Sequence, residues 1–259
     1  MGNIFNLFIT QPLLNFVILL YSIMPGWDFG LAIITITVIL RVILWPLSAK
    51  SLYNQKALKA IQPEIEKIKK KYKNDSQGLQ KAMAELYKEK EVSPFSSCLP
   101  TLLQLPVLIG LYWVFIKFKD PTFIHVANNS KSFVSQLYAW VKNFPTVKSV
   151  IVADGSLHTS FLGLVDLAKP NIILAIIAGG VQLLQTKLMT PDKPEDASQK
   201  MMANMVYIFP GITLLISLTL PAALPLYWTA STGIAAYQQW LIMNKEVTVL
   251  EHLKIKKKK

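Results

Sequence analysis

The sequence predicts an all-α polytopic membrane protein with five transmembrane helices, an N-terminal interfacial amphipathic helix and a cytoplasmic helical hairpin. Of the 259 residues, 52% are hydrophobic and only 16% are charged, whereas soluble domains carry about 25% charged residues. The mean hydropathy is +0.38. The apolar residues gather in runs close to the roughly 20 residues that a helix needs to cross a bilayer. Lysines are concentrated in one stretch between these runs and in the C-terminal tail.

Four apolar runs are long enough to span a membrane, at 29–47, 97–116, 171–189 and 202–243. The last run is about twice the length of one span. Pro221 and Pro225 interrupt it, and proline removes a backbone hydrogen bond from a helix. We therefore expect a tight turn at 221–225 and two spans within this run, which makes five spans in all.

The first 26 residues are apolar but carry polar residues at nearly helical spacing. Asn3, Asn6, Thr10 and Asn15 recur beside large apolar side chains, a pattern typical of a helix that lies in the membrane interface. The alternative is that this segment is itself a span. The stretch PGWDFG at 25–30 then turns the chain into the next apolar run.

The distribution of lysines predicts the orientation, because cytoplasmic loops carry an excess of positive residues. Lysines outnumber acidic residues between residues 50 and 91, and the tail HLKIKKKK at 252–259 is strongly basic. Five spans place these two segments on one side when the N-terminus lies on the other. We therefore expect the N-terminus outside and the C-terminus inside the cell. If the first segment also spanned, only the N-terminus would change sides.

These expectations divide the chain into ten segments. They are an external interfacial helix (1–26), a first span (27–50), a cytoplasmic helical hairpin (51–95), a second span (96–118), an external loop (119–169), a third span (170–190), a cytoplasmic loop (191–200), a fourth span (201–220), a fifth span (222–243) and a basic cytoplasmic tail (244–259). In the hairpin, Ile61, Ile65 and Ile68 fall on one helical face. Asp75 or Ser76 is the expected N-cap of its second helix.

An arginine lies inside the first predicted span. Arg41 cannot lose its charge, and a charged residue at mid-membrane costs roughly 2.5–3.5 kcal/mol on the insertion scale. No Asp or Glu lies inside any other predicted span, and Asp28 is roughly 19 Å away along the same helix. Two interpretations are open. Either Arg41 extends to the lipid headgroups beyond Pro46, or it lies in a water-filled cavity between the helices.

Polar residues in the other spans favour the cavity. Buried polar groups need hydrogen-bond partners, and bonds between helices are the alternative explanation for each glutamine and threonine. With an unpaired arginine, however, the set predicts a wet groove that would attract acidic residues of a translocating chain without using a nucleotide. The residues derived in this way are Arg41, Thr37, Gln104, Gln182, Gln185, Tyr227 and Ser231, with Thr35, Thr229, Thr232, Gln238 and Gln239 nearby.

Three stretches resemble the YidC family of membrane protein insertases and its mitochondrial Oxa and chloroplast Alb relatives. They are ITVILRVILWPLSAK (36–50), SPFSSCLPTLLQLPVLIGLYWV (93–114) and LPLYWTASTGIAAYQQW (224–240). The chain departs from the family pattern at Ser93, where Asn is usual, at Ser97, where Gly is usual, and at Thr232, where Asn is usual. No large external domain precedes the first segment, so the chain resembles the short form of the family.

The resemblance implies a five-helix core with a groove open to the cytoplasm and to lipid, in a bacterial cytoplasmic membrane. It implies that Arg41 supplies the positive charge of the groove, and that Thr37 and Trp228 match positions that contact client helices. From the residues alone, Trp228 would be an interfacial or packing aromatic. Gln104, Gln182 and Gln185 would line the groove.

The resemblance also implies partners. These are nascent membrane proteins, the Sec translocon and the signal recognition particle pathway, with the hairpin receiving the client first. The tail lysines Lys256, Lys257, Lys258 and Lys259 could contact ribosomal RNA phosphates or anionic lipid, and the sequence does not decide between these two ligands.

Other classes of function find less support. His125, His158 and His252 fall in predicted loops or the tail, and no metal-ligand spacing or phosphate-binding loop is present. The single cysteine, Cys98, excludes an internal disulfide and a cysteine-based metal site. We therefore expect no enzymatic activity and no cofactor. A secondary transporter or channel with a polar intramembrane site is the alternative, since Gly179, Gly180 and the proline-rich spans permit broken helices.

Overall fold

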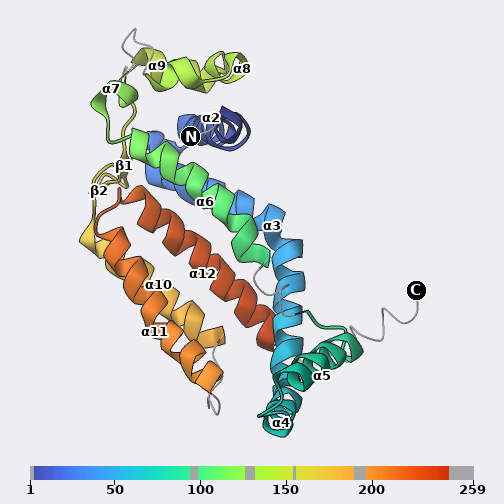
Figure 1. The fold of residues 1–259 in the computed structure, drawn as a ribbon. Coiled ribbons are helices and arrows are strands. Elements are labelled where there is room, and N and C mark those ends of the chain that lie inside the picture. The colour runs from blue at the N-terminus through green and yellow to red at the C-terminus, as the bar shows by residue number, and fades with distance from the viewer. Residues whose placement is uncertain (1–2, 94–98, 126–131, 154–155, 190–196, 245–259) are drawn as a thin grey trace. The chain divides into compact units, whose positions relative to one another are not determined.

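The computed structural model describes residues 3–93, 99–125, 132–153, 156–189 and 197–244. Most of them form helices, which confirms the all-α class (Figure 1). The chain divides into two compact units, described separately below. The first unit comprises Met1–Ile43 and Leu105–Ala236, and the second comprises Leu44–Gln104 and Tyr237–Lys259.

The long helices follow the apolar runs of the sequence. They are α2 (Gln11–Ile23), α3 (Phe29–Ala60), α6 (Leu99–Lys117), α10 (Ile172–Met189), α11 (Ala197–Ser217) and α12 (Ala223–Asn244). The shorter elements are α1 (Asn3–Phe5), the π-helix η1 (Asn6–Thr10), η2 (Pro25–Trp27), α4 (Gln62–Lys71), α5 (Ser76–Glu89), α7 (Pro121–Ile124), η4 (Phe133–Gln136), α8 (Ala139–Lys142), α9 (Pro145–Ala153) and the strands β1 (Ser160–Phe161) and β2 (Val165–Asp166).

Two helical stretches among the described residues are long and apolar enough to cross a membrane. They are Asn6–Ile23 and Phe29–Ala60. Three shorter apolar stretches, Gln104–Lys117, Ile172–Leu188 and Val206–Ser217, follow the same pattern over fewer residues. The core helix of a soluble protein can have the same length and composition.

Helices α10 and α11 pack closely and leave apolar faces uncovered. A Cβ added at Gly179 would lie 3.3 Å from Leu214 Cβ and 3.4 Å from the Pro210 carbonyl oxygen. This close approach through a small residue is typical of helix pairs in membranes. On the outer sides of the pair, large apolar side chains such as Ile176 and Leu215 are exposed. Lipid is the natural solvent for such faces.

The core of the first unit joins α2 to the segment that follows α6. Asn15 on α2 is only 2% exposed. Its amide nitrogen donates to the Gln136 carbonyl oxygen at 3.2 Å, and its amide oxygen accepts from the Tyr138 backbone nitrogen at 2.6 Å. The Tyr21 hydroxyl accepts from the His158 backbone nitrogen at 2.9 Å. These bonds fasten α2 to the backbone at residues 136, 138 and 158.

These contacts correct the reason given above for the polar pattern of the first segment. Thr10 and Asn15 do not face water, since both are buried within the protein. The exposed side chains of this segment include the apolar Leu7 and Phe8 as well as Asn6. Asn15 is polar because it pairs with backbone groups from a distant part of the chain, and such a partner is not visible in a local pattern.

Strands β1 and β2 form a short antiparallel hairpin that is anchored to the first residues of α3. Asp28 precedes this helix, and its Oδ1 accepts from the Leu31 backbone nitrogen at 2.8 Å, as an N-cap residue does. Its Oδ2 accepts from the backbone nitrogen of Leu162 in the hairpin turn. A Cβ at Gly30 would overlap the Phe161 ring, so only glycine lets the hairpin approach α3 this closely.

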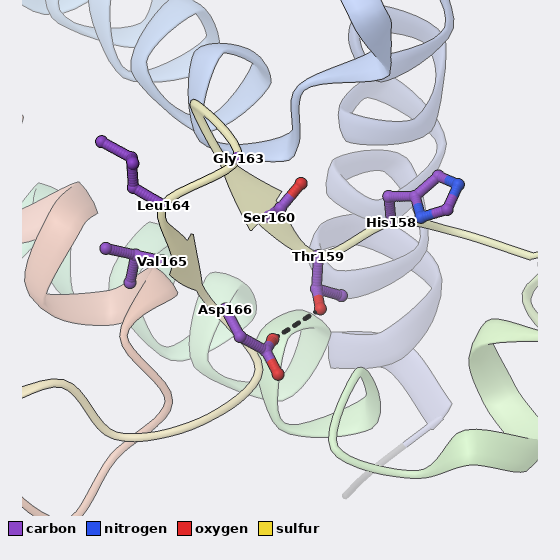
Figure 2. Close-up of a pocket in the computed structure, with 7 residues that line it drawn as sticks. All are labelled: His158, Thr159, Ser160, Gly163, Leu164, Val165 and Asp166. Carbon is purple, nitrogen blue, oxygen red and sulfur yellow. Dashed lines mark hydrogen bonds between the residues drawn. The ribbon is translucent and has the colours of Figure 1, made fainter.

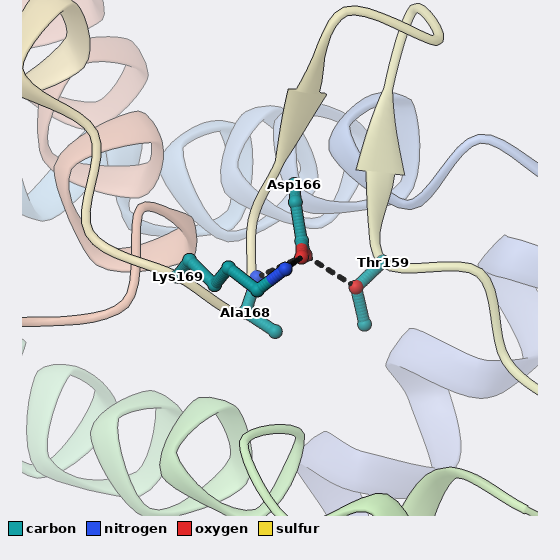
Figure 3. Close-up of polar contacts among 4 residues, drawn as sticks. All are labelled: Thr159, Asp166, Ala168 and Lys169. Atoms are coloured by element: carbon teal, nitrogen blue, oxygen red, sulfur yellow. Dashed lines mark hydrogen bonds and ion pairs between the residues drawn. The ribbon is translucent and has the colours of Figure 1, made fainter.

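One carboxylate joins the two strands of the hairpin to the residues that follow (Figure 3). Asp166 Oδ1 accepts from Thr159 Oγ1 at 2.7 Å and from the Ala168 backbone nitrogen at 3.0 Å. Its Oδ2 lies 3.0 Å from Lys169 Nζ. Burial alone would raise the pKa of Asp166, but the hydrogen bonds from Thr159, Lys169 and Ala168 outweigh it, and the pKa lies below its ordinary value of 3.8.

We expect this carboxylate to make the hairpin sensitive to acid. Because its pKa is lower in the folded than in the unfolded protein, its stabilising contribution is complete well above about pH 4 and is lost as the pH falls through the folded pKa. Thermal unfolding in detergent micelles should show wild type more stable than Asp166→Asn near neutral pH, with the difference shrinking below about pH 4. A difference that is constant with pH would contradict the assignment. The effect should be modest, since surface ion pairs are weak.

The second unit contains a pair of helices with an apolar seam. Helices α4 and α5 pack through Ile61, Ile65 and Leu86, and Lys90 Nζ lies 3.0 Å from Glu64 Oε2 beside this seam. The side chain of Asp75 accepts from the Gly78 backbone nitrogen at 2.9 Å, which confirms Asp75 as the N-cap of α5.

In the same unit, α3 is hydrogen-bonded to the last turns of α12. Gln238 Nε2 donates to the Trp45 carbonyl oxygen at 3.1 Å. Lys56 Nζ lies 3.3 Å from the carbonyl oxygens of both Ile242 and Met243. The last carbonyls of a helix have no partner within the helix, and a cation there is favourable. Lys56 therefore caps the C-terminal end of α12.

The turn between α11 and α12 lies earlier than the expected 221–225. Helix α11 ends at Ser217 and α12 begins at Ala223. Pro225 therefore belongs to the first turn of α12, where proline is tolerated because the backbone nitrogens there have no partner within the helix.

Candidate functional site

The Arg41 guanidinium makes its contact with a hydroxyl group on another helix. Its Nε and one terminal nitrogen donate to Ser231 Oγ at 2.9 and 2.6 Å. Arg41 lies on α3 and Ser231 on α12, and both residues belong to the first unit. Arg41 is partly buried, whereas Ser231 is buried. The side chain is therefore held between helices rather than extended along α3 toward its C-terminal end.

The partner of Arg41 is neutral, so the positive charge is not cancelled locally. A hydroxyl oxygen accepts hydrogen bonds but carries no net charge, and a guanidinium has five N–H donors. Among the described residues, no carboxylate forms an ion pair with Arg41. Tyr227 lies close enough to interact electrostatically with the guanidinium. The contact with Ser231 fixes the position of the cation and leaves its charge available to a ligand.

Tyr227 and Trp228 lie one turn before Ser231 on α12 but differ in exposure. Tyr227 is almost fully buried and packs in the core of the first unit. Trp228 is partly buried. The spacing of Tyr227 and Ser231, four residues apart, places both on one helical face. The Arg41 side chain meets this face.

Thr37 lies one turn before Arg41, but its hydroxyl is already used. Its Oγ1 donates to the Ile33 carbonyl oxygen of its own helix at 2.6 Å, and the residue is 1% exposed. Contact between Thr37 and a client helix therefore requires a movement of the neighbouring side chains, and its role in client binding remains a prediction.

The two predicted glutamines of α10 lie together. Gln182 Nε2 is 3.4 Å from Gln185 Oε1. In the next position of α10, Thr186 Oγ1 donates to the Gln182 carbonyl oxygen at 2.9 Å and lies 3.4 Å from the Val206 carbonyl oxygen of α11. The polar face of α10 is thus continued by a polar contact with α11. Gln104 is partly buried on α6 and belongs to the second unit, whereas the other seven predicted residues belong to the first.

Some polar atoms of the first unit are buried without a hydrogen-bond partner among the described residues. They include Thr229 Oγ1 on α12 and Ser217 Oγ at the end of α11. A buried polar atom without a partner is costly unless water reaches it. Thr229 lies two residues before Ser231, so one such atom is on α12, the helix whose Ser231 accepts hydrogen bonds from Arg41.

Sequence reasoning overlooked two charged side chains with structural roles, Asp28 and Lys56. Asp28 joins α3 to the hairpin, and Lys56 caps α12. The signal for Asp28 was present, since an aspartate directly before an apolar helical run is a typical N-cap. No local signal marks Lys56, because its partners are carbonyl groups 186 and 187 residues away in the sequence.

An open depression of about 410 Å³ lies on the hairpin, lined by residues that include His158, Thr159, Leu164 and Asp166 (Figure 2). It is separate from the site at Arg41. The hairpin is fastened to Asp28, and Arg41 follows Asp28 by roughly 19 Å along α3.

Comparisons with known proteins agree with the family resemblance. The sequence model of the family described as 60Kd inner membrane protein matches residues 19–249. The membrane protein insertase YidC of Clostridium tetani is 37% identical over 222 residues, which cover 86% of this chain and 84% of that protein. The protein of the same name from Fusobacterium nucleatum is 36% identical over 219 residues, covering 84% of this chain and 87% of that relative. A third, from Lawsonia intracellularis, is 32% identical over 92% of this chain and 39% of its own length.

Proposed function

The chain belongs to the YidC family of 60Kd inner membrane proteins, and from this we propose that it inserts nascent membrane proteins into the bacterial cytoplasmic membrane. The relatives matched over most of their length carry the name of membrane protein insertase. The role is one of binding and release rather than of catalysis, and no nucleotide takes part.

The observation that carries the mechanism is the cation at Arg41 held by an uncharged partner. A positive charge in a low-dielectric environment attracts an acidic residue of a translocating chain more strongly than it would in water. The neutral Ser231 hydroxyl orients the guanidinium without competing for its charge. The client carboxylate therefore enters the membrane at lower cost, and the apolar client helix leaves sideways into lipid.

Contacts within the first unit support five alternating spans, namely α3, α6, α10, α11 and α12. The end of α6 meets the beginning of α3, where the Phe118 and Phe29 ring centroids are 4.7 Å apart. The Lys169 carbonyl oxygen, shortly before α10, accepts from the Ala222 backbone nitrogen at 2.9 Å, and Ala222 directly precedes α12. Three helices thus begin at one end of the bundle, while α6 and α11 end there.

The N-terminal segment belongs to that same end, which we propose is external. Helix α2 is bonded to the backbone at residues 136, 138 and 158, between α6 and α10. Because η1 exposes the apolar Leu7 and Phe8 beside the polar Asn6, the segment suits the membrane interface. The N-terminus is then outside, and α4, α5 and the C-terminus are inside.

The inner segments are proposed to receive clients and their delivery machinery. Helices α4 and α5 carry a basic surface around an apolar seam, which suits contact with the signal recognition particle pathway, the Sec translocon or anionic lipid. The lysines at 256–259 lie outside the described residues. Their proposed ligand is ribosomal RNA or anionic lipid, and the slope of affinity against salt for each ligand would separate the two.

A reconstituted assay tests the proposed function. Proteoliposomes with the purified chain should insert a small single-span client after removal of nucleotides, as shown by a protease-protected fragment. Empty liposomes provide the background. A transporter would instead change solute uptake and leave the client unprotected, so these two readouts separate the alternatives.

Access of water to the groove can be tested independently. With Cys98 replaced by serine, single cysteines at 37, 41, 182 and 228 should be tested with a membrane-impermeant thiol reagent added from the cytoplasmic side. We expect reaction at 41, 182 and 228 and slower reaction at 37, where the side chain is buried. A lipid-facing cysteine at Ile176 is the control and should not react. Equal protection at all positions would mean that the bundle is dry.

A further inference from the structure

The turn of the β1–β2 hairpin presents two large apolar side chains to its surroundings. Leu162, Gly163 and Leu164, here called the hairpin tip, connect the two strands, and Leu162 and Leu164 are 58% and 84% exposed. Leu164 extends away from the polar side chains of Thr159 and Asp166 (Figure 2). The tip is therefore apolar on its outer side, whereas Thr159 and Asp166 at the base of the hairpin are polar.

The backbone of the tip makes leucine an unusual choice at position 162. Leu162 has φ of 51° and Gly163 has φ of 69°. A turn in water that needs a positive φ takes Gly or Asn, because other side chains are strained there. Such an outlier points to a function when the surrounding structure holds it in place. Here the Asp28 carboxylate accepts from the Leu162 backbone nitrogen, and the Leu164 backbone nitrogen donates to the Phe161 carbonyl oxygen at 2.9 Å.

The hairpin lies at the end of the bundle where three proposed spans begin. The residues that follow β2 bond to the beginning of α12, with the Ala223 backbone nitrogen donating to the Leu167 carbonyl oxygen at 3.1 Å. The chain then enters α10, whose first residues Ile172 and Ile173 are both 63% exposed. The tip and the exposed first residues of α10 thus belong to the same end of the bundle, where α3, α10 and α12 begin.

We propose that the hairpin tip inserts into the outer leaflet of the phospholipid bilayer, with Leu162 and Leu164 among the upper acyl chains, and that Asp28 transmits this anchor to α3. The inference rests on the proposed spanning arrangement. An inserted tip would also fix the depth of the Arg41 guanidinium in the membrane, because Arg41 lies roughly 19 Å beyond Asp28 along α3. In a hydrocarbon core of about 30 Å, that distance places Arg41 in the inner half, on the side from which clients arrive.

Depth-dependent quenching tests the proposal. In the Cys98→Ser background, single cysteines at 162 or 164 are labelled with an environment-sensitive fluorophore, and the protein is reconstituted in phosphatidylethanolamine–phosphatidylglycerol vesicles. We expect blue-shifted emission, strong quenching by lipids with a nitroxide near the headgroup and loss of most quenching by aqueous iodide. A label at Lys148, an exposed charged position on α9, is the aqueous control.

Two outcomes would overturn the proposal. Iodide quenching at 162 and 164 equal to that at 148 would place the tip in water. Shielding from iodide without quenching by the lipid nitroxides would show that protein covers the tip. A label at Ile176 reports on the spanning arrangement itself. If iodide also quenches the label at 176, α10 does not face lipid and the spanning arrangement behind the proposed function is contradicted. If the label at 176 is shielded while the tip is quenched, only this inference is overturned.

The variant Leu162→Asn separates anchoring from folding. Asparagine tolerates a positive φ better than leucine does, so the thermal midpoint in detergent should be unchanged or higher. In vesicles, the label at 164 should become more accessible to iodide because one of the two inserted side chains is lost. An unchanged accessibility would refute a contribution of Leu162 to the anchor. Val152→Asn, at another exposed apolar position on α9, is the matched control and should leave the tip shielded.

Discussion

Replacing Arg41 with alanine should strongly slow the insertion of clients whose translocated tails carry acidic residues and should change little for clients with uncharged tails. An acidic side chain at mid-membrane costs roughly 2.5–3.5 kcal/mol. If the guanidinium offsets most of this cost, its removal lowers the population of the inserted intermediate by up to about 100-fold. The measurement is the rate of appearance of the protease-protected fragment for a client series that differs only in tail charge.

Three further variants separate charge from hydrogen bonding at this site. Arg41→Lys keeps the charge and should retain most of the activity on acidic clients. Ser231→Ala removes the neutral partner at 2.6 and 2.9 Å but not the cation, and should have a smaller effect than Arg41→Ala. The double variant Arg41→Ser with Ser231→Arg places the guanidinium on α12 instead of α3, at the same contact. We expect it to recover part of the activity that Arg41→Ala loses on acidic clients, because the position of the positive charge, and not the helix that carries it, determines the attraction.

A loss of activity that is equal for acidic and uncharged tails would contradict this mechanism. It would mean that the contact between Arg41 and Ser231 serves only to hold α3 against α12. The thermal midpoint of each variant in detergent is the accompanying control, since a destabilised bundle would impair every client.

The class of fold and the main helices could be predicted from the sequence because bilayer-length apolar runs are a strong local signal. One face of the seam between α4 and α5 could also be predicted, because Ile61, Ile65 and Ile68 follow helical periodicity and Asp75 is a typical N-cap. The hairpin of β1 and β2 could not be predicted from the sequence, because its two-residue strands are too short to show alternation of apolar and polar residues. Its turn is held by Asp28, which is 134 positions away in the sequence, and its base is held by the contact of Asp166 with Thr159.

For the candidate site, the residue types could be predicted but not their pairing. A charged residue in an apolar run identified Arg41, yet its bond to Ser231 spans 190 positions and depends on how α3 packs against α12. The same limit explains Asn15, which looked like a water-facing residue but pairs with backbone groups at 136 and 138. Local spacing tells which residues share a face of a helix, and tertiary packing decides what that face meets.

Substituting alanine for Asp28 should destabilise the protein far more than the same substitution of Asp75, although both aspartates cap a helix. Each loses an N-cap bond, which costs about 1 kcal/mol. Asp28→Ala also leaves the Leu162 backbone nitrogen without its acceptor, and a donor that loses its buried partner costs about 1–3 kcal/mol more. Asp75 is exposed and bonds only within its own turn.

Thermal unfolding in detergent micelles provides the comparison. A total of about 2–4 kcal/mol for Asp28→Ala corresponds to a fall in the midpoint of roughly 5–15 °C, against about 2–4 °C for Asp75→Ala. Asp28→Asn should lie between them, because the amide keeps one acceptor oxygen for the two donors, Leu31 and Leu162. Equal midpoints for the two alanine variants would show that Asp28 is only a helix cap, and the hairpin would then have to be held against α3 by the packing of Phe161 on Gly30 alone.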